Sequence, residues 1–216
     1  MGIVVGYILL GLSIAAPIGP INIEIINRGL KYGFWPSFCV GLGGMTFDFF
    51  FMAFMFMGLA QVLGIVWVKA SLMLLGSVIL ITSGWTSLKG APPETLHESE
   101  FPSRELKREA LKGYLTGFTI AGTNPMNLLF WLGIYGSVLS TALTKGNPLE
   151  SFLISSLVFV GLGLWNANLA FTIHYGRILM NGTITKLVHV TASFILIGFG
   201  IRFGYLSCIE WLNFFI

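Results

Sequence analysis

Six apolar runs separated by short polar stretches fill most of this 216-residue chain. They predict membrane spans near residues 3–27, 34–59, 68–88, 113–139, 150–174 and 188–212. A helix needs about 20 apolar residues to cross the hydrocarbon core of a bilayer, where the backbone must satisfy its own hydrogen bonds. The runs are long and lack the alternation of barrel strands. The pattern therefore predicts an all-α integral membrane protein with six transmembrane helices.

Composition agrees with this class, because 55% of the residues are hydrophobic and only 10% are charged. Soluble domains carry roughly 25% charged residues, so most of this surface cannot face water. Lys69 at the start of the third run leaves a five-span protein as an alternative. No Lys or Arg precedes the first run, so we expect a retained span there rather than a cleaved signal peptide.

The basic residues indicate how the chain is oriented. Nine of the twelve lie after spans one, three and five, namely Arg28, Lys31, Lys89, Arg104, Lys107, Arg108, Lys112, Arg177 and Lys186. By the positive-inside rule this side is cytoplasmic. We therefore expect a multi-pass protein of the cytoplasmic membrane, with the polar stretch 89–112 as a cytoplasmic linker. The net charge of +3 marks orientation and does not indicate nucleic-acid binding.

The two halves of the chain resemble each other in three places, in the same order. Gly11-Leu-Ser-Ile-Ala15 and Pro20-Ile-Asn22 correspond to Gly117-Phe-Thr-Ile-Ala121 and Pro125-Met-Asn127. Val40-Gly-Leu-Gly43 with Asp48 corresponds to Val160-Gly-Leu-Gly163 with Asn168, and the run from Ala70 to Gly76 corresponds to that from Ala192 to Gly198. A tandem three-helix unit enters the membrane the opposite way the second time. We therefore predict two inverted repeats, 1–88 and 113–216, within one transporter domain.

Prolines stand at equivalent places in the first and fourth spans. Proline removes a backbone donor and disrupts the helix, and the freed carbonyls and the new helix N-terminus can bind the charged groups of a substrate. An ordinary packing kink is the alternative. The residues predicted to bind substrate are Pro17, Gly19, Pro20, Asn22, Glu24, Asn124, Pro125, Asn127, Trp165 and Asn168.

Two carboxylates within the spans are candidates for function. Asp48 lies near the middle of the second span, where a charge costs about 2.5–3.5 kcal/mol, so we expect it to face the protein interior and to couple transport to an ion. A structural hydrogen bond between helices is the alternative. Glu24 shares a helix face with Pro20, but an ion pair with Arg28 one turn later is an equally good reading.

Motifs for other chemistry are lacking in the sequence. It contains no glycine-rich phosphate loop, no Ser/His/Asp set and no zinc motif, so we predict no enzyme activity, no cofactor and no metal site. Cys39 and Cys208 do not form a disulfide framework. The expected partners are the lipid bilayer and a small-molecule substrate, and the sequence leaves a homo-oligomer open.

The whole chain resembles the LysE-type amino-acid exporters, the lysine and homoserine/threonine exporter superfamily. The resemblance rests on Pro17-Ile-Gly19-Pro20, on Arg28-Gly-Leu-Lys-Tyr-Gly33, on a glycine-rich second span with Asp48, and on Asn124-Pro125 followed by Phe130-Trp131. It implies export of amino acids driven by the membrane potential or the proton gradient. Two features depart from the family pattern: an extra residue separates the first prolines, and Met126 replaces a common lysine.

These observations predict a secondary active exporter of amino acids or related small metabolites, working by alternating access around the two proline breaks and Asp48. One alternative is an inorganic ion exporter, which Asp48 and Glu24 could serve. A membrane thiol redox carrier is the other alternative, although Cys39 and Cys208 do not occupy equivalent positions in the two repeats.

Overall fold

The computed structural model describes residues 2–57, 66–89, 102–124, 127, 131, 148–179 and 182–215. Over these residues the chain is helical and contains no strand. Its helices are α1 (Gly2–Ala15), α2 (Pro20–Tyr32), α3 (Phe34–Phe56), α5 (Val66–Lys89), α6 (Ser103–Thr123), α8 (Pro148–Ser155), α9 (Val158–Leu179) and α10 (Gly182–Phe215).

The first predicted span is a broken helix. The chain from Val4 to Ala15 and the chain from Pro20 to Tyr32 meet at an angle of 74°. Gly19 between them is extended, and Pro20 begins α2. Proline is tolerated there because the first N–H groups of a helix have no hydrogen-bond partner within the helix. The proline-rich element therefore bends the chain sharply instead of kinking one continuous helix.

A single glycine joins α2 to α3. Gly33 has φ 85°, in the left-handed region that only glycine adopts readily, and its N–H bonds the Gly29 carbonyl oxygen to end α2. Because α3 begins at the next residue, Phe34, the reversal between the two helices is tight. The two helices pack against each other as a result.

The short helix α2 lies at the centre of the bundle, although it is rich in polar residues. It packs against α3, α6, α9 and α10. Its Ile23 belongs to one apolar cluster with residues of α5, α6 and α10, and its Ile25 belongs to another with residues of α3 and α9. Eight of its residues are buried, namely Pro20, Asn22, Ile23, Glu24, Ile25, Asn27, Gly29 and Leu30.

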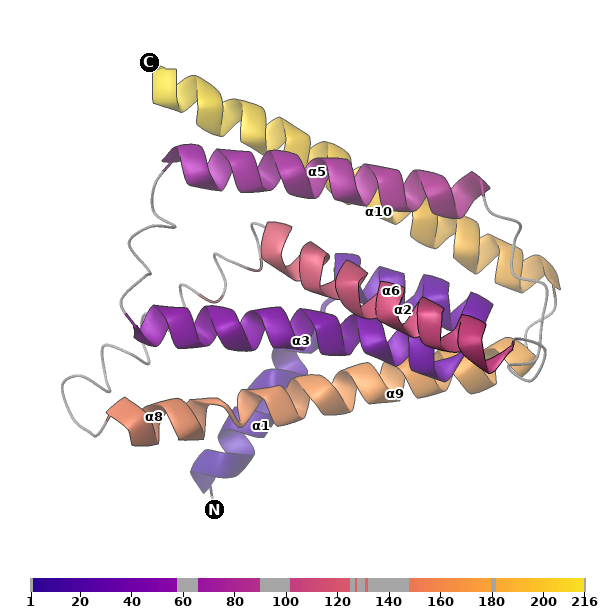
Figure 1. Cartoon of the computed structure of the whole chain (residues 1–216), viewed down its shortest axis with the longest axis horizontal. Coiled ribbons are helices and arrows are strands. Elements are labelled where there is room, and N and C mark those ends of the chain that lie inside the picture. The colour runs from indigo at the N-terminus through magenta and orange to yellow at the C-terminus, as the bar shows by residue number, and fades with distance from the viewer. Residues whose placement is uncertain are drawn as a thin grey trace.

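Two helices from different halves of the chain, α5 and α10, lie side by side in an antiparallel pair (Figure 1). At one end the Ser207 hydroxyl donates to the Ala70 carbonyl at 2.8 Å. At the other end the Ser193 hydroxyl donates to the Ser87 hydroxyl at 2.9 Å. These hydrogen bonds fix the register between the two helices.

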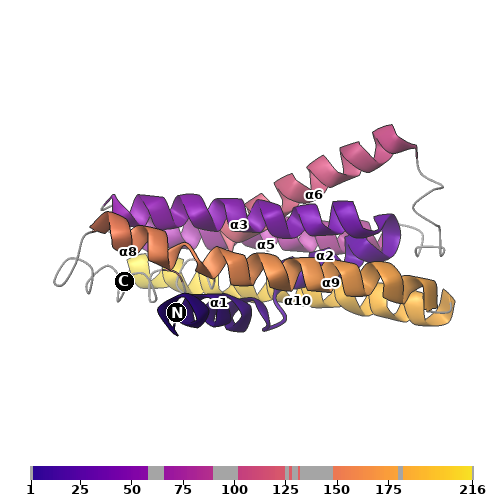
Figure 2. The same ribbon diagram turned by 90° about the horizontal axis from the view of Figure 1, so that it is seen from below.

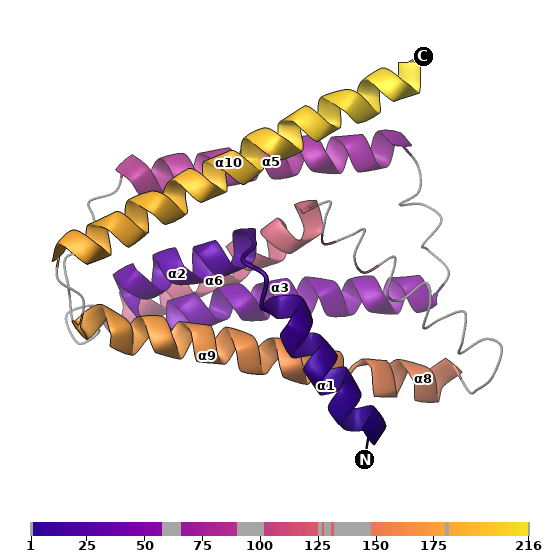
Figure 3. The same ribbon diagram turned by 180° about the vertical axis from the view of Figure 1, so that it is seen from behind.

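Glycines let two further helix pairs cross at close range. A Cβ added at Gly117 of α6 would overlap the Val40 carbonyl oxygen of α3. In the same way, a Cβ added at Gly11 of α1 would overlap the Val158 carbonyl oxygen of α9. Figure 3 shows α1 crossing α9. Small residues at crossings of this kind allow backbones in membrane bundles to approach closely.

The outer surface of the bundle is apolar. Exposed large side chains include Trp35 and Phe54 on α3, Leu74 and Trp85 on α5, and Phe171 on α9. Exposed apolar side chains of this kind are suited to contact with lipid. The apolar helices and this surface are those of a multi-pass membrane protein.

Helix lengths match part of the predicted topology. Among the described residues three helices are long and apolar enough to span a membrane, Phe34–Met55, Leu149–Arg177 and Gly182–Leu212, and the broken pair of the first span makes a fourth. Helix α5 covers the predicted third span, but its apolar part, Met73–Lys89, is shorter. The six-span arrangement stays a prediction.

The fourth predicted span begins earlier than its apolar run. Helix α6 starts at Ser103, ten residues before Gly113, where the apolar run begins. No glycine or proline interrupts this polar stretch, and Glu109 and Lys112 pair at i,i+3 within it. The exposed Ser103 end of α6 stands away from the other helices (Figure 2). Most of the remainder of this span lies outside the described residues.

The close contact between α3 and α6 at Gly117 can be tested by the stability that the protein loses when a methyl group is added there. We expect Gly117→Ala to lose about 1–3 kcal/mol of folding free energy, because the added methyl group overlaps the backbone of α3. The measurement is the unfolding midpoint of the protein in detergent. Gly198→Ala on α10 is the matched control, since a Cβ there meets nothing within 4 Å. Equal midpoints for the two variants would contradict the close crossing.

Candidate functional site

At the first helix break the side chain of Asn22 binds two backbone carbonyl groups that have no donor within a helix. Its amide nitrogen donates to the Ala15 carbonyl and to the Pro17 carbonyl, at 2.9 Å in both cases. Helix α1 ends at Ala15, so these oxygens have no continuing helix to bind them. A buried amide thus replaces the missing backbone donors, and Asn22 is held at the break itself.

The second break is built in a similar way. Helix α6 ends at Thr123, and Asn124 is extended with ψ 105°. The Asn127 amide nitrogen donates to the Ala121 carbonyl at 3.2 Å, and the Asn127 backbone N–H donates to the Asn124 side-chain oxygen at 3.4 Å. Pro125, predicted as part of this site, lies outside the described residues.

Asp48 on α3 is attached to this second break. Its carboxylate accepts a 2.6 Å hydrogen bond from the Asn127 amide nitrogen, and the indole of Trp131 interacts with the same carboxylate. Asp48 is only 5% exposed, which confirms the expectation that it faces the protein interior. A carboxylate in such a place needs polar partners, because an unpaired buried charge is costly.

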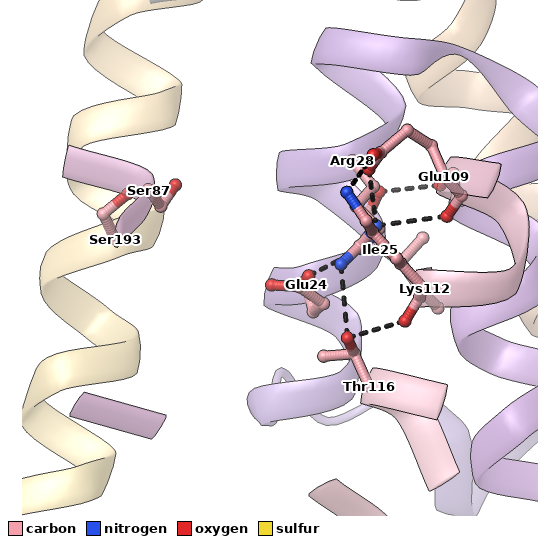
Figure 4. Close-up of polar contacts among 9 residues, drawn as sticks. Glu24, Ile25, Arg28, Ser87, Glu109, Lys112, Thr116 and Ser193 are labelled. Carbon is pink, nitrogen blue, oxygen red and sulfur yellow. Dashed lines mark hydrogen bonds and ion pairs between the residues drawn. The ribbon is translucent and has the colours of Figure 1, made fainter. Parts of the chain in front are cut away.

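Glu24 and Arg28 form the ion pair that the sequence analysis raised as an alternative. The Arg28 Nε lies 2.8 Å from a Glu24 oxygen, and the side chains of both residues are largely buried. Arg28 also reaches α6, where it donates to the Glu109 carbonyl at 3.2 Å and to the Thr116 hydroxyl at 3.2 Å. Figure 4 shows these contacts converging on one guanidinium group. The pair therefore joins α2 to the helix that begins the second half of the chain.

Beside this network lies a cavity of about 390 Å³. Helices α2, α5, α6 and α10 all contribute to its wall. The lining residues are Glu24, Asn27, Arg28, Lys31, Tyr32, Thr82, Ser83, Thr86, Ser87, Glu109, Lys112, Thr116 and His189. This volume is within the range of about 300–1,000 Å³ that is usual for small-molecule sites.

The predicted site residues fall into separate groups. Asn22 lies at the first break with Pro17, Gly19 and Pro20, whereas Asp48 joins Asn124 and Asn127 at the second. Glu24 belongs to the cavity. The two predicted site residues on α9 differ in burial, since Trp165 is half-buried and Asn168 is exposed.

Several cavity residues were not among the predicted site residues. Sequence reasoning treated Arg28 and Lys112 as orientation signals, and it passed over Asn27. The spacing of Glu24, Asn27 and Arg28 on one helix face just after a proline break was the available signal. Glu109 carried no such signal, because it lies in a stretch that resembled an exposed linker.

The described side chains include no group of three His, Cys, Asp or Glu residues that could hold a metal ion. Cys39 on α3 and Cys208 on α10 are both free thiols.

Comparison with known proteins gives one family and two relatives. The model of the LysE type translocator family matches residues 12–207. The "Putative amino acid efflux protein YcgF" of Bacillus subtilis (strain 168) is 36% identical over 205 residues, which cover 95% of this chain and 96% of that protein. The "Chemotactic transduction protein ChpE" of Pseudomonas aeruginosa is 27% identical over 169 residues, covering 74% and 79% respectively. No solved structure matches.

Because the family model and the first relative cover nearly the whole chain, the chain belongs to the LysE type translocator family. It is a transporter and not an enzyme.

The Glu24–Arg28 pair can be tested by removing one partner. We expect Arg28→Met to cost about 3–5 kcal/mol of folding free energy, since it leaves the buried Glu24 carboxylate unpaired. The unfolding midpoint in detergent measures this cost. Glu24→Gln combined with Arg28→Met should recover part of the loss. Arg108→Met, at an exposed position of α6, is the control, and equal losses for the two arginines would refute the buried pair.

Proposed function

We propose that this member of the LysE type translocator family is a secondary active exporter of amino acids or related small metabolites across the cytoplasmic membrane. The proton gradient or the membrane potential would drive it. The observation that carries the proposal is that α1 and α6 each end beside an asparagine side chain, which binds a carbonyl group of the helix end. Secondary transporters place their substrates at discontinuous helices of this kind. The name of the Bacillus relative favours amino acids as the substrate.

Equivalent hydrogen bonds at the two breaks support an inverted repeat. Asn22 donates to the carbonyl of Ala15, and Asn127 donates to the carbonyl of Ala121. These residues correspond in the two halves of the sequence, where each alanine closes a Gly-X-X-Ile-Ala run and each asparagine follows a proline by two positions. Two unrelated helix breaks would have no reason to share this bond.

The helix crossings support the same repeat. The Ile8 carbonyl of α1 meets Gly161 of α9, and the Tyr114 carbonyl of α6 meets Gly43 of α3. Ile8 and Tyr114 each lie three residues before the first glycine of the matched motif, and both partner glycines belong to Val-Gly-Leu-Gly motifs. The first span of each half therefore crosses the second span of the other half.

The proposed repeats run from residue 1 to 88 and from residue 113 to 216, with a cytoplasmic linker over 89–112. Since α6 begins at Ser103, the second part of that linker is the start of the helix that enters the second repeat. Arg28, Lys31 and Lys112 gather around the cavity, which supports a cytoplasmic location for this end of the bundle.

Asp48 is the proposed coupling residue. Its hydrogen bond to Asn127 links a buried carboxylate directly to the second break. Binding of a proton or a cation neutralises the carboxylate and weakens this charge-assisted bond, so the charge state of Asp48 biases the geometry of the fourth span. In this arrangement the hydrogen bond between Asp48 and Asn127 connects the binding of the driving ion to the position of the fourth span.

Efflux assays test the coupling role. We expect Asp48→Asn to lower gradient-dependent efflux by about tenfold or more, because the asparagine cannot change charge. The assay uses proteoliposomes preloaded in turn with each of the twenty radiolabelled amino acids. Glu150→Gln, at an exposed position of α8, is the matched control. Normal gradient-dependent efflux by Asp48→Asn would remove Asp48 from coupling.

Cysteine labelling tests the topology. In a variant with Cys39→Ser and Cys208→Ser, a membrane-impermeant maleimide should label Glu150→Cys in intact cells. It should label Glu105→Cys only in inverted membrane vesicles. Both positions are exposed, so accessibility to the reagent reports the side of the membrane. Labelling of both from the same side would contradict the six-span topology.

A further inference from the structure

Two buried side chains of the cavity carry polar atoms that have no hydrogen-bond partner among the described residues. The amide nitrogen and the amide oxygen of Asn27 are both in this state, and Asn27 is 5% exposed. Nδ1 of His189, which is also 5% exposed, is the third such atom. Proteins rarely keep buried polar groups unpaired without a function, and both residues line the same cavity.

In this structure the three atoms have almost no surface open to the cavity, so a ligand reaches them by turning the Asn27 and His189 side chains toward itself. Asn27 offers both a donor and an acceptor. The His189 Nε2 lies 3.0 Å from the Ser87 carbonyl oxygen, which can only accept, so Nε2 donates and Nδ1 of the neutral ring is an acceptor. The unpaired set therefore has two acceptors for an ammonium group and one donor group for a carboxylate.

The charged residues that line the cavity give a second indication of which ligands it can bind. The carboxylates of Glu24 and Glu109 are paired with Arg28 and Lys112. Lys31 contacts the ring of Tyr32 at 5.0 Å and makes no ion pair with another described residue. Three cations against two carboxylates leave the lining with one excess positive charge. A ligand with a further cationic group is therefore repelled, whereas a zwitterion or an anion is not.

We propose that this cavity is the cytoplasmic loading site of the exporter, and that it selects amino acids whose side chains carry no positive charge. Once the two side chains turn toward the ligand, Asn27 Oδ1 and His189 Nδ1 accept from its ammonium group and the Asn27 amide nitrogen donates to its carboxylate. This inference rests on the proposed export function and adds to it a location and a substrate class.

The cavity is separate from the Asp48–Asn127 contact, since neither residue lines it. It adjoins the first break through Glu24, two residues after Asn22. A ligand loaded here would stand against the helix whose break Asn22 stabilises. Substrate and coupling ion thus act on different breaks, which suits an exporter with two repeats.

Binding to the purified full-length protein tests the selectivity. Isothermal titration with the twenty amino acids should show binding of at least one neutral or acidic amino acid and about tenfold weaker binding, or none, of lysine and arginine. Asn27→Leu, which keeps the volume but removes both polar atoms, should weaken binding by about tenfold or more. Thr172→Val, at an exposed position of α9, should leave binding unchanged.

Ligand protection provides a measurement that does not depend on the folding of Asn27→Leu. Ser83→Cys in the variant lacking Cys39 and Cys208 places a single thiol in the cavity lining. Saturating amounts of an exported amino acid should slow maleimide labelling of this thiol by about tenfold, and lysine should not.

The outcomes separate the two proposals. Efflux of an amino acid without protection of the Ser83→Cys thiol would overturn the loading site and leave the export function standing. Equal protection by lysine would overturn the charge selection. No efflux and no binding with any of the twenty amino acids would overturn the export function itself, and the loading site with it.

Discussion

The Arg28 guanidinium bonds Glu24 on its own helix and Glu109 and Thr116 on α6, and this network holds a polar helix in the middle of an apolar bundle. Lipid cannot solvate the charges of Glu24 and Arg28, so these two must find partners inside the protein. They pair with each other, and Arg28 finds further partners on a helix about eighty residues along the chain. Packing of α2 against α6 is thus tied to the pairing of one arginine.

Glycine and proline make this pairing possible by different means. Gly117 and Gly43 let α3 and α6 approach closely, which brings α6 within reach of the charges of α2. Helix α1 ends at Ala15 before Pro17 and Pro20, and α6 ends at Thr123; the carbonyl groups near these ends are bound by Asn22 and Asn127. Close backbone contact therefore holds the helices together, and asparagine side chains satisfy the backbone groups at the helix ends.

Some predictions could be made from sequence because they depend on local chemistry. The apolar run that begins at residue 34 correctly predicted the first residue of α3, and the prolines correctly predicted the position of the first break. The burial of Asp48 followed from the cost of a charge at mid-span. Glu109 could not be assigned in this way, because its stretch of α6 is as polar as a linker and only contact with Arg28 makes it part of the interior. Depth in the span favoured Trp165 and the position matching Asp48 favoured Asn168, but neither criterion shows which face of α9 is turned inward, and Asn168 is exposed.

The sequence by itself determined that this is a membrane protein of apolar helices with a proline break in its first span, because transfer to lipid and loss of a backbone donor are properties of single segments. Tertiary structure alone decided which polar residues of different helices contact each other. Asp48 bonds Asn127 across 79 positions, and the cavity joins residues of four helices. Such encounters depend on the crossing points of whole helices, and these are set by packing that no local pattern encodes.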